Sequence, residues 1–206
     1  MFQPTTSSPS PVPLLDERRH LAHAAEAAIG GRVQHLSEVA ERGPGAYLML
    51  YCGDLDMYAR AARAGGPTSL LEGGGYPIYA GSAASLIERR QRHVRNLEGL
   101  IDLSEDDLRI VLVPTTSEAG AGYVEKLFIR AFEPVWNQPW LAGFGSKRQG
   151  RIRERGQRVS PWNVLHPGRY IHPSAPRPIA TQADLAGKVV NYLAGTVSPV
   201  YEARRS

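Results

Sequence analysis

The chain has 206 residues, of which 42% are hydrophobic and 21% charged, and its mean hydropathy is −0.29. These values are typical of a soluble globular protein with one sizeable core. Its apolar runs fall well short of the ~20 residues that a membrane-spanning helix needs, so we expect no membrane segment. The start, MFQPTTSSPSPVPLL, does not have the pattern of a secretory signal, and a single cysteine, Cys52, excludes an internal disulfide framework or a multi-cysteine zinc site. We therefore expect a cytoplasmic protein.

Positive charge is concentrated in one segment. The whole chain carries a net charge of +4, whereas segment 147–158, KRQGRIRERGQR, has six basic residues and one acidic residue. Arginine dominates this segment, and its planar guanidinium matches phosphate oxygens and the guanine edge. We predict that the segment contacts nucleic acid; a solvated loop is the alternative. The predicted nucleic-acid-binding residues are Lys147, Arg148, Gln149, Arg151, Arg153, Arg155 and Arg158.

The predicted elements begin after a short arm. Residues 1–13 are rich in proline, serine and threonine, so we expect them to be disordered. We expect N-terminal helices over residues 14–42, because apolar residues follow a helical stripe up to the Gly30-Gly31 pair. A short second helix is predicted over residues 36–41.

Three short apolar runs predict the strands of a sheet. They are AYLMLYC at 46–52, YPIYAG at 76–81 and RIVLVPT at 109–115. An insertion, 54–75, separates the first two, and we expect it to begin as a helix over residues 54–64 and to end in glycine-rich loops.

Helices are predicted after the second and third strands. Ser82 is expected to cap a helix over 83–96, and Ser117 a helix over 117–132. The buried stripe of the latter helix is predicted to be Val124, Leu127, Phe128 and Ala131. A loop-rich stretch and an amphipathic helix over 181–195 follow. This order predicts an α+β (mixed α/β) fold, with a small three-stranded sheet flanked by helices, an N-terminal helical arm and a C-terminal extension.

Two tripeptides stand at corresponding places in the first two strands. Gly45-Ala46-Tyr47 opens one strand, and Tyr79-Ala80-Gly81 closes the next. Each alone is weak evidence, because tyrosine is common in strands. Together they resemble the GIY and YIG signatures of the GIY-YIG nuclease family, with alanine in place of isoleucine in both. That family has an arginine on the next helix and, in its restriction-enzyme branch, a histidine four residues later, which Arg89 and His93 match.

The resemblance continues through the second half of the chain. Glu125 matches a glutamate on the helix after the third strand, and Asn137 an asparagine that follows it. GFGSK at 143–147 and WNVLHPGR at 162–169 also look like segments of that branch; His166, in the latter, is predicted to stabilise a turn rather than to bind a ligand. The resemblance covers roughly residues 35–170 and is strongest to type II restriction endonucleases that cut a GC-rich palindrome. Those relatives have an extra segment between the YIG strand and the arginine helix.

The resemblance implies a nuclease core over residues 43–140 and, in the same domain, a basic DNA-contacting loop and C-terminal helix over 141–206. It implies hydrolysis of phosphodiester bonds in double-stranded DNA by a homodimer with Mg²⁺, for which Mn²⁺ can substitute. Tyr47 would be the base, Arg89 would stabilise phosphate charge, and Glu125 would hold the metal. The candidate catalytic residues are Tyr47, Tyr79, Arg89, His93, Glu125 and Asn137.

Plainer interpretations of these residues remain open. The tyrosines can be buried strand aromatics. Arg89 lies among Arg90, Arg92 and Arg95, which can form a solvated basic face, and its spacing from Gly81 is the reason to choose it as the catalytic arginine.

The remaining candidates have structural alternatives too. His93 can be a core histidine, Glu125 can form a salt bridge with Lys126 or Arg130, and Asn137 can cap a turn or hold a neighbouring residue. Two other functions are consistent with the sequence: a repair or homing nuclease of the same family, and a non-catalytic basic DNA-binding protein.

Overall fold

The computed structural model describes residues 33–58, 76–144, 159–169, 171, 175–176 and 178–195. The predicted arm at 1–13, the expected helix up to Ile29 and most of the insertion lie outside the described residues. So do all seven predicted nucleic-acid-binding residues, because positions 145–158 are not described. Within the described part, no helix is long and apolar enough to cross a membrane.

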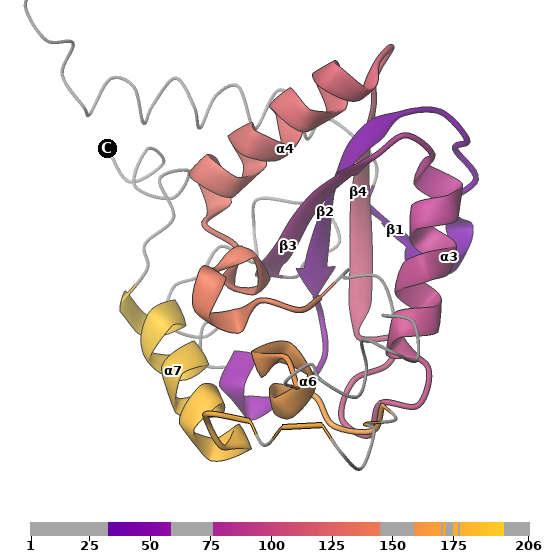
Figure 1. Ribbon diagram of the computed structural model, residues 1–206. Coiled ribbons are helices and arrows are strands. Elements are labelled where there is room, and N and C mark those ends of the chain that lie inside the picture. Colours follow the sequence, from indigo (N-terminus) through magenta and orange to yellow (C-terminus); the bar gives the residue numbers. More distant parts are fainter. Residues whose placement is uncertain are drawn as a thin grey trace, which may run out of the picture.

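A four-stranded antiparallel sheet forms the centre of the fold (Figure 1). Its order is β1-β4-β2-β3, where β2 is Gly45–Tyr51, β3 is Tyr76–Ala83, β4 is Leu108–Pro114 and β1 is Val33–His35. The three predicted strands and the α+β class are confirmed. The expected number of strands was too low, because β1 has only three residues and shows no alternation by which sequence could identify it.

The predicted helix over 36–41 is wrong. Leu36–Glu38 form a single 3-10 turn, η1, and Val39 already has an extended backbone. The Glu38 carboxylate accepts a hydrogen bond from the His35 backbone N–H at 3.0 Å, which closes the turn where β1 ends. Leu36 is buried, so tertiary packing holds this segment against the sheet.

The central strand β2 is buried at every position and separates two apolar clusters. Alternate side chains of a strand point to opposite faces, so Ala46 and Leu48 lie in one cluster, and Tyr47 and Met49 in the other. Helix α4, Glu118–Phe132, covers the first face with Phe128, and Figure 1 shows it alongside β3. Of the predicted α4 stripe, Phe128 and Ala131 are buried, and Val124 and Leu127 are half-buried.

Helix α3, Leu86–Leu97, follows β3 (Figure 1). Its N-cap is Ser85, whose hydroxyl accepts from the Glu88 backbone N–H, and not Ser82 as the sequence predicted. Strand β3 runs past the expected end at Gly81, because Ser82 still pairs with Ala46 of β2. By contrast, Ser117 caps α4 as predicted, and its hydroxyl accepts from the Gly120 N–H at 3.1 Å.

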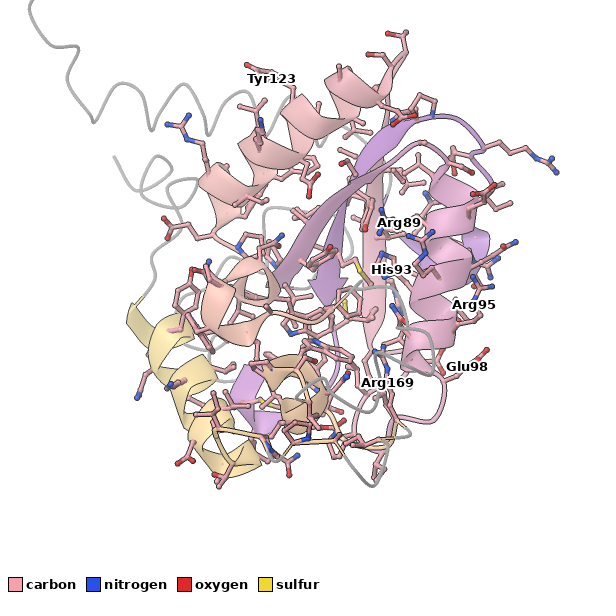
Figure 2. All side chains as sticks on the ribbon, viewed as in Figure 1. Arg89, His93, Arg95, Glu98, Tyr123 and Arg169 are labelled. Carbon is pink, nitrogen blue, oxygen red and sulfur yellow. The ribbon has the colours of Figure 1, made fainter. Side chains whose placement is uncertain are left out.

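The chain after α4 consists of short elements and a terminal helix. The 3-10 turns η2, Val135–Asn137, and η3, Pro139–Leu141, precede α6, Pro161–Leu165, and α7, Gln182–Gly195. The α7 bounds confirm the predicted terminal helix. Arg169, after α6, donates from Nε to the Asn96 carbonyl at 2.7 Å near the end of α3, as its place in Figure 2 also shows. This contact fastens the segment around α6 to the helix that follows the second signature.

Candidate active site

The two signature tripeptides pair directly in the sheet. Tyr47 of β2 lies opposite Gly81 of β3. The Tyr47 phenol lies over Gly81, and a Cβ at that position would overlap the phenol oxygen. Glycine at 81 therefore makes room for the ring of Tyr47, which is only 1% exposed. This contact is the steric reason for the glycine of the second signature.

The Tyr47 hydroxyl contacts His93 of α3. Tyr47 Oη and His93 Nε2 are 2.7 Å apart, and the two rings meet edge-on with centroids 5.4 Å apart. His93 is fully buried, and its other ring nitrogen, Nδ1, is buried without a hydrogen-bond partner among the residues that the structure describes. The arrangement gives the tyrosine a neighbouring nitrogen that can exchange a proton with it.

Tyr79 lies beside both of these rings. Its centroid is 6.1 Å from that of Tyr47 and 6.0 Å from that of His93. Unlike Tyr47, Tyr79 is half-buried. It is therefore the phenol of the pair that lies nearer to solvent.

Arg89 reaches the same part of β3 from one turn earlier on α3. Its Nη2 donates to the Ser82 carbonyl at 3.1 Å. Figure 2 shows Arg89 and His93 on the side of α3 that faces the sheet, whereas Arg95 lies further along the helix. The structure thus places Arg89, the arginine chosen on spacing, next to the predicted site.

Glu125 approaches from α4, on the other side of edge strand β3. Its Oε2 accepts a short hydrogen bond from the Ser82 hydroxyl. Ser82 thus joins the guanidinium, through its carbonyl, and the carboxylate, through its hydroxyl. The sequence assigned Ser82 to a helix cap and so missed it as a site residue, although its position just after the second signature was a usable signal.

Electrostatics confirm that these groups share one neighbourhood. Burial raises the pKa of Tyr47 well above its usual 10, while Arg89 opposes that rise and Glu125 adds to it. Tyr79 also has a raised pKa, again mainly from burial, and feels the same two charged groups. Two phenols, a guanidinium and a carboxylate therefore converge at one end of β3.

His93 is kept neutral by its surroundings. Burial, the largest cause, and the positive charges of Arg89, Arg92 and Arg169 together lower its pKa from 6.5 to about 3. At neutral pH the pair consequently consists of a neutral imidazole and a protonated phenol. A neutral imidazole has one nitrogen lone pair that can accept a proton.

Asn137 holds the backbone of β3 rather than pointing to a free position. Its Oδ1 accepts from the Ala80 N–H at 2.8 Å, and its Nδ2 donates to the Ala80 carbonyl at 2.9 Å. The side-chain amide thus makes the pair of backbone hydrogen bonds that a neighbouring strand would otherwise make with β3. Of the roles considered from the sequence for Asn137, which were catalysis, capping a turn and holding a neighbouring residue, the contacts match the last.

A second buried tyrosine–histidine pair lies outside this group. The Tyr58 hydroxyl and His166 Nε2 are 2.7 Å apart, and His166 Nδ1 is 3.2 Å from Asp102 Oδ2. Trp136 Nε1 donates to the Tyr58 oxygen at 2.9 Å. His166 therefore stabilises more than its own turn, since it joins α6 to the loop after α3 and to the beginning of the insertion.

A comparison with protein families agrees with the geometry. The sequence model described as the Eco29kI GIY-YIG domain matches residues 72–193, more than half of the chain. The chain belongs to the Eco29kI family of GIY-YIG restriction endonucleases. A comparison with curated proteins gives no significant match.

The Eco29kI family match covers most of the candidate site. It includes Tyr79, Arg89, His93, Glu125 and Asn137, and it begins after Tyr47. Tyr47 joins the group through the sheet, because β2 pairs with β3 inside the matched region. The fold and family agree that this is an endonuclease of the GIY-YIG type.

Proposed function

We propose that the chain is a type II restriction endonuclease that hydrolyses phosphodiester bonds of double-stranded DNA at a palindromic site. The observation that supports this most strongly is the convergence of Tyr47, Arg89 and Glu125 at the end of β3. Phosphodiester hydrolysis needs a base for the attacking water, a cation for the developing negative charge and help for the leaving oxygen. The three groups can fill these roles in one place.

Tyr47 acts as the general base, with His93 as its proton acceptor. A buried phenol with a raised pKa is a poor base by itself. The contact at 2.7 Å allows Tyr47 to give its own proton to His93 Nε2 as it takes one from water. His93 is neutral across the neutral range, so Nε2 carries a free lone pair in the tautomer that has its proton on Nδ1.

Arg89 and Tyr79 act on the phosphate. The half-buried Arg89 guanidinium donates from Nη2 to the Ser82 carbonyl, and a guanidinium has five N–H donors, so others can donate to phosphate oxygens. Tyr79, half-buried beside it, can orient the phosphate or the water. Donors fixed before the reaction stabilise the transition state without reorganisation.

Glu125 is the residue that would hold the divalent cation. Mg²⁺ commonly binds through one or two carboxylates and keeps several waters and substrate phosphate oxygens. The half-exposed Glu125 fits that habit, and no group of three or more potential ligands lies within the described residues. When bound there, the ion would supply a Lewis acid for the phosphate. The Ser82 hydroxyl orients the carboxylate from the other side.

Two basic regions are proposed to bind the DNA backbone. One is the predicted segment 147–158. The other is α3, which carries four arginines, none of them ion-paired within the part of the chain that the structure describes: Arg89, Arg90, Arg92 and Arg95. Such unneutralised positive charge next to a nuclease site favours a polyanion. A palindromic site calls for a two-fold dimer, since matching half-sites need matching subunits.

Plasmid cleavage tests the proposal. We expect the protein with Mg²⁺ to cut a mixed-sequence plasmid at one palindrome, and Glu125→Gln to abolish cutting while duplex binding in a gel shift persists. The matched control is Glu118→Gln, an exposed glutamate in the first turn of the same helix, which should cut like wild type.

Each alternative gives a different result in this experiment. Cutting restricted to damaged or branched DNA would indicate a repair nuclease, and cutting at a long asymmetric site a homing nuclease. Binding without product under any divalent cation would indicate a DNA-binding protein. Full activity of Glu125→Gln would refute the metal assignment.

A further inference from the structure

Phe144 is a buried aromatic residue at the end of a described segment. It follows Gly143, whose φ of +137° is one that side chains with a Cβ rarely adopt. The chain turns sharply there, and the Phe144 ring is only 6% exposed. A buried phenylalanine is usual in an apolar core, so the role of Phe144 depends on which rings it contacts.

The Phe144 ring packs on two candidate catalytic rings at once. It lies parallel to His93, with an interplanar angle of 3° and a centroid distance of 4.9 Å. It meets Tyr79 edge-on, at 78° and 4.8 Å. Behind it, Trp136 and Trp162 are 4.5 Å and 5.1 Å away, so the ring itself is firmly held.

His93 needs such a neighbour because few polar contacts fix it. Within the described part of the chain, the His93 side chain has one hydrogen bond, between Nε2 and Tyr47, and Nδ1 has no partner. An imidazole with a single hydrogen bond can turn about that bond. A parallel phenyl ring restricts this rotation and closes one face of the imidazole to water.

We propose that Phe144 is a positioning residue for the nuclease reaction: it holds the plane of His93 so that Nε2 faces Tyr47, and it keeps water away from His93. The inference rests on the proposed function, since it assumes that His93 accepts the Tyr47 proton. Phe144 itself contacts neither water nor phosphate in this role.

The proposal predicts a change in pH dependence, which a merely structural role would not produce. The polar and charged groups around His93 are Tyr47 from β2, Tyr79 from β3, Arg89 and Arg92 from α3, and Arg169 after α6. None of these is altered by replacing Phe144. Burial is the largest cause of the low His93 pKa, so admitting water moves that pKa up towards 6.5. A protonated His93 cannot accept a proton, so activity is lost at acidic pH.

The experiment compares kcat and KM between pH 5 and 9 for wild type and Phe144→Leu. We expect kcat of the variant to fall about 10- to 100-fold at pH 8. We expect a further fall between pH 7 and 5 that wild type does not show, with KM changed less than about threefold. Phe144→Tyr keeps the ring and should restore most of kcat and the wild-type profile.

The matched control is Phe132→Leu, the same substitution at a 2% exposed site in the apolar cluster on the other face of the sheet. It tests whether loss of packing alone reproduces the effect. The proposal fails if Phe144→Leu and Phe132→Leu have the same kcat and pH profile. It also fails if, by NMR in the wild-type protein, the His93 ring titrates near 6.5, a measurement that requires no variant to fold.

The two proposals fail in different ways. Absence of cleavage by wild type would refute the proposed function. Cleavage by wild type together with an unaltered Phe144→Leu profile would refute only the role of Phe144.

Discussion

Two buried tyrosine–histidine pairs in this protein have the same contact and different surroundings. Tyr47 and His93 are 2.7 Å apart, and so are Tyr58 and His166. Both histidines are fully buried. A search for close tyrosine–histidine contacts would not separate them.

The hydrogen bonds beyond each pair separate them. Around Tyr58 the hydrogen bonds follow one another without a break. Trp136 N–H donates to the Tyr58 oxygen, the Tyr58 hydroxyl can donate to His166, and His166 Nδ1–H can donate to Asp102. Every donor in that sequence has an acceptor when the imidazole is neutral. The donors from Trp136 to His166 are thus all satisfied, and within the described residues only Asp102 Oδ1 at the end of the network is buried without a hydrogen-bond partner. Such a network stabilises one arrangement of the chain.

The pair at the end of β3 is incomplete by comparison. Among the described residues, His93 Nδ1 has no hydrogen-bond partner, and the charged groups that act on His93 are arginines rather than a carboxylate. An unsatisfied buried nitrogen costs stability, and it leaves the pair without a carboxylate to fix its protons. We therefore propose that the Tyr47–His93 pair, which lacks a carboxylate partner, serves proton transfer. The Tyr58–His166 pair, which has one, supports the fold.

The largest expected contrast is in catalysis. Tyr47→Phe removes the proposed base and should lower kcat by about 10²–10⁴-fold. Tyr58→Phe removes the same atom from the complete network and should leave kcat per folded molecule near wild type. Single-turnover cleavage of a DNA duplex measures both. Equal losses in the two variants would show that the two pairs do not differ in function.

The next contrast is in acid stability. The folded protein holds the His93 pKa near 3, while the unfolded chain has the ordinary 6.5, so the unfolded chain takes up the proton first as pH falls. The contribution of His93 to the free energy of unfolding is therefore fully present above pH 6.5, and it is lost as the pH drops towards 3. Between pH 7 and 4 wild type should therefore lose about 3 kcal/mol more unfolding free energy than His93→Gln. Urea denaturation at both pH values measures this, and parallel losses would contradict it.

The smallest contrast is in stability at neutral pH. Tyr58→Phe leaves the Trp136 N–H and His166 Nε2 without partners, and we expect it to lower the free energy of unfolding by about 1–3 kcal/mol. Chemical denaturation at pH 7 gives the value. A variant as stable as wild type would mean that the network adds nothing to the fold.

The signatures predicted the parts of the molecule that depend on local sequence. The strand runs, the cap of α4 and the tyrosines of the two tripeptides could be read directly, and the spacing from Gly81 selected Arg89. The site residues also came from a family resemblance, which supplied the roles of Glu125 and Asn137. Local sequence patterns are enough to predict a site residue where the residue and the pattern that identifies it lie in the same element.

What the sequence did not predict depends on contacts between distant elements. Ser82 has the features of a helix cap, and only the pairing of β3 with β2 carries it into the sheet and towards Glu125. Phe144 is one of several aromatics, and nothing local shows that it stacks on His93. The basic segment 147–158 stays a prediction, because it lies outside the described residues.

The two hydrogen bonds between Asn137 and the Ala80 backbone also limit how copies of this protein can assemble. Exposed edge strands invite another chain to add to the sheet, and proteins block them in various ways. Here a side-chain amide occupies both backbone groups of Ala80 on the outer strand. A homodimer that joins its sheets through this part of β3 would have to break both bonds beside the reacting groups. The subunits of the proposed homodimer are therefore expected to meet through other surfaces, leaving each candidate active site intact.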